Sequence, residues 1–265
     1  MKHIKTIINK EWSEVFKNRW VISTMTLLPM LFTALPLVML ATTGGSALSA
    51  EIGAESSGLP AGFVAGCAGL SATDCMQIYL LNQFMLMFMM MPLMIPTTIA
   101  AYSIVGEKTT RSLEPLLATP ITTIELLAGK GLAAVIPGAL ISYAAFGVFI
   151  LGGLIIKLSP AVLAHILSPT WLLGILVLGP ILSVIAAIFA IYVSSRVSDP
   201  RVAEQLSGMV IMPLLLVMFA VLAGKIVLNI WFMLIAIVVC TLFAFGMLHL
   251  GTIIFDRENI LTKWK

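Results

Sequence analysis

Six long stretches of this chain contain no charged residue. Each can hold the roughly 20 apolar residues with which an α-helix crosses about 30 Å of hydrocarbon. The stretches are solidly apolar, whereas the strands of a membrane β-barrel alternate between apolar and polar positions. Apolar residues make up 60% of the 265 residues and charged residues only 10%, far less charge than a soluble chain carries. The stretches are residues 20–50, 75–106, 131–156, 158–195, 205–224 and 226–255.

The sequence therefore predicts an all-α, polytopic membrane protein with six transmembrane helices, forming a single domain over residues 1–265. An amphipathic interfacial helix is expected to precede the first span. We expect the spans near residues 21–42, 77–105, 129–156, 171–194, 206–223 and 230–252.

The basic residues indicate the orientation. With the N-terminus inside, thirteen lysines and arginines lie in cytoplasmic segments, and only Lys157 and Lys225 lie outside. This bias predicts a cell-membrane protein with both termini in the cytoplasm. The charges show no basic patch with interleaved aromatic residues, so a nucleic-acid partner is not expected, whereas anionic lipid headgroups are.

Residues 3–20 have the pattern of a helix lying on the membrane surface. Apolar side chains recur at spacings of three and four, and the lysines occupy other faces. The alternative is a plain cytoplasmic tail. A removable signal peptide is not expected, because charges continue up to the start of a full-length span. The apolar residues are Ile4, Ile8, Trp12, Val15 and Phe16.

The first external loop, near residues 43–76, is rich in Gly, Ala and Ser. Cys67 and Cys75 lie in it and could form a disulfide in an oxidising compartment, or could simply be two small loop residues. The second external loop, residues 157–170, contains two prolines that bracket a short surface helix. In the cytoplasmic loop 194–205, Asp199 followed by Pro200 is typical of a helix start.

The cytoplasmic loop between the second and third spans has the most specific sequence, GEKTTRSLEPLLATPITTIELLAGK, residues 106–130. Ser112 can cap a short helix with Glu114 in its first turn. Thr122 and Glu125 have the T-x-x-E spacing of a capping box, which begins the next helix. The loop thus encodes a short capped helix between two long ones. Its apolar stripe is formed by Leu113, Leu116 and Leu117.

Catalytic motifs are absent from the sequence. A P-loop needs the pattern G-x-x-x-x-G-K-[ST], and neither Gly-Lys pair of the chain fits it, so ATP hydrolysis would require another chain. The spans carry charged residues only at their ends, which disfavours intramembrane catalysis and ion pumping. The methionine-rich run at residues 85–94 could in principle bind Cu(I). A flexible apolar lining or a lipid-facing surface is favoured instead, and no metal site is expected.

The pattern E-K-x-x-R-S-L-E-P-L-L-A-T-P-I-T-x-x-E-L-L-x-G-K resembles the permease subunit of ABC transporters of the type-2 exporter family. The turn R-x-x-D-P-R-x-A-E-Q and the ending F-D-R-E-N are similar to that family too. The resemblance implies two partner ATP-binding subunits, which bind ATP and Mg, and a second permease, either a copy or a homologue. It implies no cofactor in this chain.

The resemblance also implies site residues. In that family the short helix of the first cytoplasmic loop, here residues 106–128, contacts the ATPase, and the N-terminal helix lies against the same side of the membrane, here through Trp12 and Phe16. The alternative is a helix that only joins two spans. The expected coupling residues are Glu107, Arg111, Ser112, Leu113, Glu114, Leu116 and Leu117.

The expected function is that of the transmembrane subunit of an ATP-driven exporter. Its charge-free interior favours a hydrophobic or amphipathic cargo. Two other classes stay open from the residues alone: a membrane anchor for a soluble partner, and a polytopic membrane enzyme.

Overall fold

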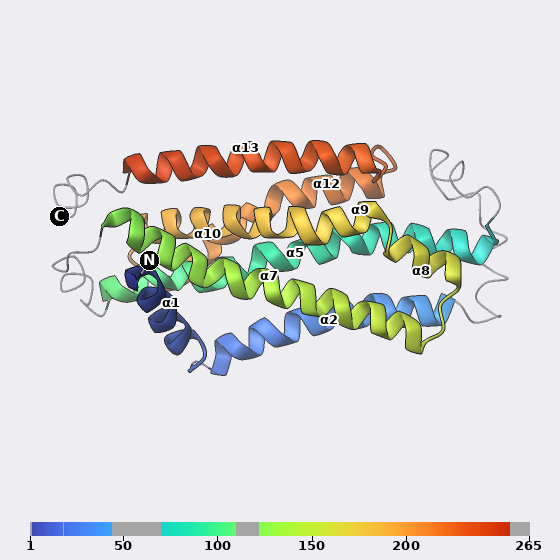
Figure 1. The fold of residues 1–265 in the computed structure, drawn as a ribbon, viewed down its shortest axis with the longest axis horizontal. Helices are drawn as coiled ribbons and strands as arrows, with labels where there is room; N and C mark the ends of the chain where they lie inside the picture. Colours follow the sequence, from blue (N-terminus) through green and yellow to red (C-terminus); the bar gives the residue numbers. More distant parts are fainter. Residues whose placement is uncertain (1, 18, 44–69, 110–121, 255–265) are drawn as a thin grey trace.

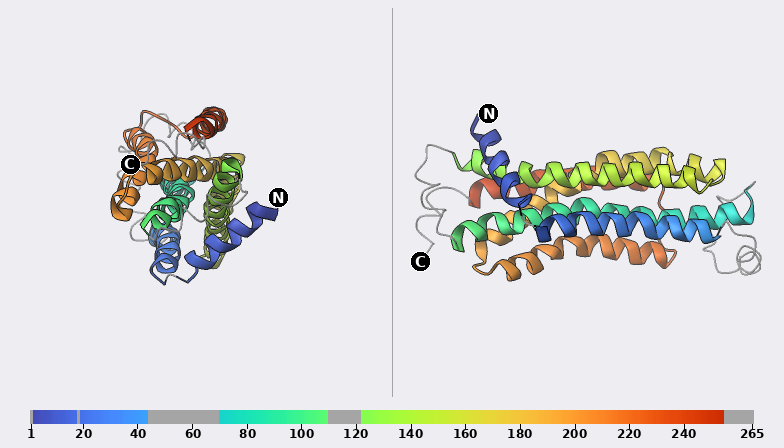
Figure 2. Two further views of the ribbon diagram at one scale, coloured as in Figure 1. Left: turned by 90° about the vertical axis from the view of Figure 1, so that its left-hand side faces the viewer. Right: turned by 90° about the horizontal axis from the view of Figure 1, so that it is seen from below.

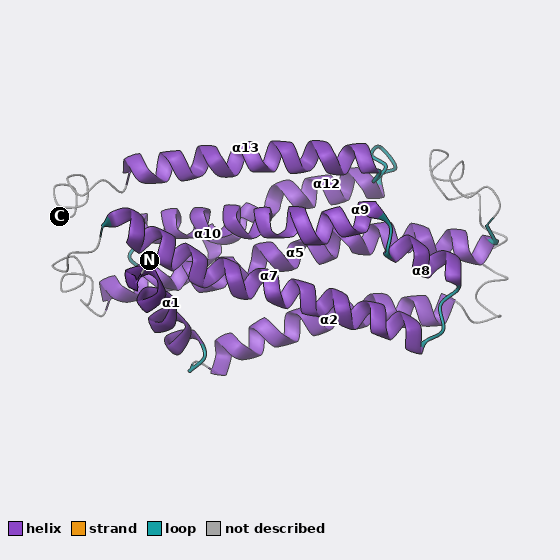
Figure 3. Ribbon diagram, viewed as in Figure 1, coloured by secondary structure: helices purple, strands orange, loops and turns teal. Residues whose placement is uncertain are grey.

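The computed structural model describes residues 2–17, 19–43, 70–109 and 122–254 (Figure 1). Within these ranges every regular element is a helix (Figure 3). The elements are α1 (Lys2–Val15), α2 (Arg19–Thr43), α5 (Ala72–Thr109), α7 (Thr123–Ile155), α8 (Pro160–Ile166), α9 (Pro169–Leu172), η3 (Leu173–Leu178), α10 (Gly179–Arg196), α11 (Pro200–Ser207), η4 (Gly208–Ile211), α12 (Met212–Leu222) and α13 (Ile230–Ile254).

Six helical segments are long and apolar enough to cross a membrane, so the predicted all-α, six-span architecture is confirmed. Four of them are single helices: α2, α5, α7 and α13. The fourth span joins α8, α9, η3 and α10, and the fifth joins α11, η4 and α12. α5 begins at Ala72, five residues before the expected start of the second span.

The fourth span is not the regular helix that its apolar run predicted, because η3 is a π-helical segment. Pro180 follows it and has no N–H to donate to the carbonyl of Leu176, four residues earlier. The hydroxyl of Tyr143 on α7 donates a hydrogen bond to that carbonyl at 3.0 Å. The irregular turn is therefore tied to the neighbouring helix.

α5 is the central helix of the bundle and contacts α2, α7, α8, α10, α11 and α12 (Figures 1 and 2). The methionine-rich run belongs to its buried part, where Met85, Met89 and Met91 are almost fully buried. Of the two alternatives expected for this run, a flexible apolar lining or a lipid-facing surface, the second is wrong for these three side chains. Unbranched thioether side chains instead fill the space between packed helices.

Close helix packing in the middle of the bundle depends on small residues and on aromatic rings. A Cβ added to Gly138 on α7 would lie 2.5 Å from Pro96 Cγ on α5, so glycine is needed for this approach. Nearer α8, Trp171 is fully buried and stacks on Phe146 and Phe149, with ring centroids 6.1 Å apart in each pair. These contacts join α5, α7 and the fourth span into one core.

α1 lies at one end of the bundle and runs across its long axis (Figure 2). We call this end the α1 end. The last turns of α5, the first turns of α7 and the end of α10 lie at the same end (Figure 1). The described residues that flank the 110–121 segment, which itself lies outside the described ranges, are therefore close to α1.

Candidate coupling site at the α1 end

α1 packs directly on the first turns of α7. Ile7 is buried against Gly129, where an added Cβ would lie only 2.9 Å from Ile7 Cβ. Glycine at this position lets the two helices approach more closely than any other residue would. Ile7, which is not among the apolar residues of the predicted membrane-surface pattern, therefore faces protein, and the interfacial position of the helix stays a prediction.

Trp12 fixes α1 to α7 by a hydrogen bond. Its indole Nε1–H donates to the carbonyl oxygen of Ala133 at 2.9 Å. In a regular helix that carbonyl would accept from the N–H of residue 137, but residue 137 is proline, which has none. The indole thus satisfies a carbonyl that Pro137 leaves without its helical partner.

A buried group of charged side chains joins α1, α5 and α7. The ammonium group of Lys130 on α7 lies 2.9 Å from Glu11 Oε1 and 3.0 Å from Glu107 Oε2. It also donates to the hydroxyl and the carbonyl of Ser103, at 2.8 and 2.9 Å. Lys130 is only 2% exposed, and both carboxylates are 6% exposed. We call Lys10, Glu11, Ser103, Glu107 and Lys130 the ionic cluster.

Lys10 closes the cluster from the solvent side. Its ammonium group lies 2.6 Å from the second oxygen of Glu107, Oε1. Partial burial opposes the charged form of Lys10, but the hydrogen bond and the charge of Glu107 outweigh it, so the pKa of Lys10 is raised above its ordinary value. The two cations and two carboxylates balance in charge, which is the condition under which buried ionised groups are tolerated.

The end of α5 that carries Glu107 is bonded to α10 through a buried hydroxyl. Ser194 of α10 is fully buried, and its hydroxyl donates to the carbonyl of Ala101 at 2.7 Å. The same hydroxyl accepts from the N–H of Val105 at 3.0 Å. These two backbone groups are the pair that closes one turn of an α-helix. Ser194 therefore ties this turn of α5 to α10.

The predicted helix starts are confirmed at the same end. Thr122 and Glu125 form the capping box of α7, with the side chain of each bonded to the backbone N–H of the other. Asp199 caps α11, and Pro200 occupies its first turn. α7 therefore begins at a defined residue directly after the 110–121 segment.

Of the coupling residues expected from the sequence, the described ranges contain only Glu107, which lies in the ionic cluster. The other six, Arg111, Ser112, Leu113, Glu114, Leu116 and Leu117, lie outside the described residues and stay a prediction. Cys75 is buried at the start of α5, but Cys67 lies outside the described residues, so their pairing also stays a prediction.

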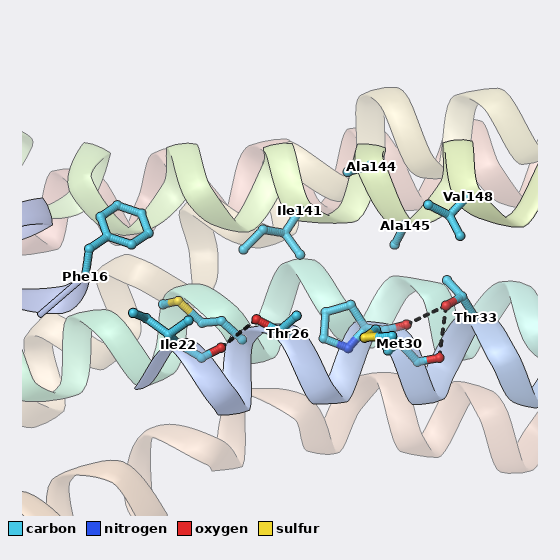
Figure 4. Close-up of a pocket in the computed structure, with 11 residues that line it drawn as sticks. Phe16, Ile22, Thr26, Met30, Thr33, Ile141, Ala144, Ala145 and Val148 are labelled. Atoms are coloured by element: carbon cyan, nitrogen blue, oxygen red, sulfur yellow. Dashed lines mark hydrogen bonds between the residues drawn. The ribbon is translucent and has the colours of Figure 1, made fainter. Parts of the chain in front are cut away.

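Phe16 lies apart from the ionic cluster, with its ring packed edge-to-face on Trp12. Figure 4 shows it at one end of a groove of about 270 Å³ between α2 and α7. The hydroxyls of Thr26 and Thr33 in this groove bond to carbonyls of their own helix, so the lining offers mostly apolar surface (Figure 4). Trp12 of α1 and Phe16, which directly follows α1, thus have different neighbours.

Sequence reasoning did not identify Lys10, Glu11, Ser103 or Lys130 as site residues. One signal was present: Glu11 falls on the face of α1 that carries Ile4 and Ile7, at helical spacing. An acidic residue on an apolar face needs a buried cation. Lys130, at the first turns of a membrane span, is such a cation.

A model of the ABC-2 family transporter proteins matches residues 5–249. The chain belongs to this family. A search of curated proteins found no match.

The family assignment makes the chain the membrane permease of a transporter. ABC-2 permeases have no ATPase site and bind no cofactor themselves, and they generally pair with ATP-binding subunits. The α1 end, where the loop between the second and third spans begins and ends, is thus the candidate site of contact with such a subunit.

Proposed function

We propose that this ABC-2 permease is the transmembrane subunit of an ATP-driven exporter whose α1 end faces the cytoplasm. Two ATP-binding subunits bind ATP and Mg, and a second permease, a copy or a homologue, completes the pathway. The concentration of Lys and Arg in segments at the α1 end supports this orientation. The apolar, charge-free spans favour a hydrophobic or amphipathic cargo.

The ionic cluster is the observation that carries the coupling role. Glu107 stands three residues before the 110–121 segment, and Lys130 stands nine residues after it. Both bind the same helix, α1, through Lys10 and Glu11. A force applied to the segment between them would therefore move α1, α5 and α7 together.

In this mechanism, closure of the ATP-binding subunits pushes the segment 107–120. The end of α5 then moves at the turn to which Ser194 is bonded, and α7 moves through its capped first turn. The two helices carry the motion to the interface between the two permeases, where the pathway opens alternately to each side. Arg111, Ser112, Glu114 and the leucines of the segment would form the contact surface.

Charged substitutions on the apolar stripe test the contact. We expect Leu113→Asp with Leu117→Asp to abolish co-purification with the co-expressed ATP-binding subunits, because two carboxylates would be buried without partners. The matched control is Leu167→Asp, an exposed leucine near α8 at the other end of the bundle, which should leave co-purification intact. An intact complex in the double variant would show that the assignment of the contact surface is wrong.

A further inference from the structure

A second groove lies at the α1 end between α7, α10 and α13. It is larger than the groove that Phe16 lines. Its volume is about 600 Å³, within the roughly 300–1,000 Å³ of sites that bind small ligands. Small residues on its floor, such as Ala128, Gly131 and Ala187, create the space. Tyr192 is the one lining residue with a polar side-chain atom among the described residues.

The groove lies within the part of the chain that is long and apolar enough to cross a membrane. All of its lining residues belong to candidate membrane spans. Large apolar side chains on its rim are exposed, among them Ile124, Leu132 and Leu250. Apart from the Tyr192 hydroxyl, the lining offers no polar side-chain group to a water-soluble ligand, whereas a hydrocarbon chain would bury apolar surface on both sides.

One cation stands at the end of the groove. The guanidinium carbon of Arg196, in the last turn of α10, lies 5.2 Å from the ring centroid of Tyr192, which lines the groove. The Arg196 side chain is exposed, and within the described residues it forms no ion pair. An arginine held on an aromatic ring keeps its five donors available to an anion, and its planar fork fits a phosphate.

We infer that this groove binds an anionic phospholipid of the surrounding leaflet, with one acyl chain along α7, α10 and α13 and the phosphate headgroup at Arg196. The apolar lining would bind the acyl chain, and the guanidinium of Arg196, which has no ion pair within the described part of the chain, would bind the charged headgroup. A second copy of the protein would instead have to place a carboxylate at Arg196 and cover the whole groove.

A lipid bound in this groove would affect the movement of α7. The chain would lie on Leu127, Ala128 and Gly131, in the turns of α7 that also carry Gly129 and Lys130. Bound lipid would therefore limit how far α7 can move against α10 and α13. The permease would respond to the anionic lipid content of the leaflet, whether or not the transport mechanism proposed above holds.

The test measures binding alone. The full-length protein is placed in vesicles of phosphatidylcholine that contain a trace of phosphatidylglycerol with a photoreactive acyl chain. Cross-linked peptides are then located by mass spectrometry. A phosphatidylcholine probe with the same photoreactive chain serves as the neutral comparison. We expect labelling of α7, α10 and α13 at the groove, about fivefold higher for phosphatidylglycerol, because one arginine near the membrane surface contributes about that factor.

Two pairs of variants distinguish binding of the acyl chain from binding of the phosphate headgroup. Gly131→Leu fills the groove and should remove labelling by both probes. Gly131→Ala is the matched control, since its Cβ would meet Ile191 Cδ1 at an ordinary 3.8 Å. Arg196→Gln should lower phosphatidylglycerol labelling to the phosphatidylcholine level, whereas Arg201→Gln, on α11 at the same end of the bundle, should not.

Three results would overturn the proposal. Equal labelling by both probes in the unsubstituted protein would show nonspecific apolar contact only. Unchanged labelling in Gly131→Leu would show that the chain lies elsewhere. A disulfide between two copies through Leu132→Cys would show that a second copy covers the groove.

Discussion

At the scale of single residues, proline determines where two helices are fixed to their neighbours. Pro137 leaves the carbonyl of Ala133 without its helical donor, and Trp12 supplies one. Pro180 does the same for Leu176, and Tyr143 supplies the donor. In a bilayer such a carbonyl has no water to bind, so a side-chain donor from a neighbouring helix replaces it.

Lys130 should be the residue on which the stability of the α1 end depends most. Lys130→Met leaves the Glu11 carboxylate buried without its cation and removes one of the two cations of Glu107. We expect the free energy of unfolding in detergent to fall by about 3–5 kcal/mol. Lys225→Met, an exposed lysine outside the ionic cluster, should change it by less than about 0.5 kcal/mol. Equal effects of the two substitutions would contradict the account.

Ser194 should affect coupling more than stability. Ser194→Ala removes both bonds that α10 makes through this hydroxyl to the backbone of Ala101 and Val105, which loosens the contact between α10 and the end of α5. We expect cargo to stimulate ATP hydrolysis by the assembled transporter less strongly. The decrease should correspond to a loss of about 0.5–2 kcal/mol of coupling free energy. Ser142→Ala is the control, because the buried Ser142 hydroxyl bonds to the carbonyl of Gly138 within its own helix. If both variants couple normally, the end of α5 does not move at this turn.

At the scale of elements, local patterns were sufficient for the spans and their caps. Apolar length predicted six spans, and the Thr122–Glu125 and Asp199–Pro200 pairs predicted two helix starts, because each signal lies within a few residues. The ionic cluster was not predicted, because Glu11 and Lys130 are 119 residues apart and meet only through packing. The π-helical turn was missed since apolar composition does not report backbone irregularity.

α5 carries two prolines, Pro92 and Pro96, in the middle of a helix that leads directly to Glu107. Proline removes a backbone hydrogen bond and bends a helix, so this part of α5 is suited to relay motion from the α1 end. We expect Pro92→Ala with Pro96→Ala to keep the ATP-binding subunits bound but to abolish ATP-driven transport in liposomes. Unchanged transport in the double variant would refute the relay.

At the scale of the whole molecule, burial is uneven among the spans. α5 is enclosed by its neighbours, whereas α12 and α13 lie at the periphery of the bundle (Figure 2). α12 and α13 expose most of their apolar surface. The exposed surfaces are available to lipid and to the second permease of a transporter. The pathway would then form between two such subunits rather than inside one.

The central claim is that the ionic cluster transmits motion from the ATP-binding subunits to the spans. The most direct test is cargo-stimulated ATP hydrolysis by the assembled transporter in liposomes, measured for Glu11→Ala and for Glu14→Ala. Glu11 binds Lys130 in the buried cluster, whereas Glu14 is an exposed residue of the same helix, 3.8 Å from Lys10. We expect Glu11→Ala to keep basal hydrolysis but lose stimulation by cargo, and Glu14→Ala to keep both. Full stimulation in Glu11→Ala would contradict the account.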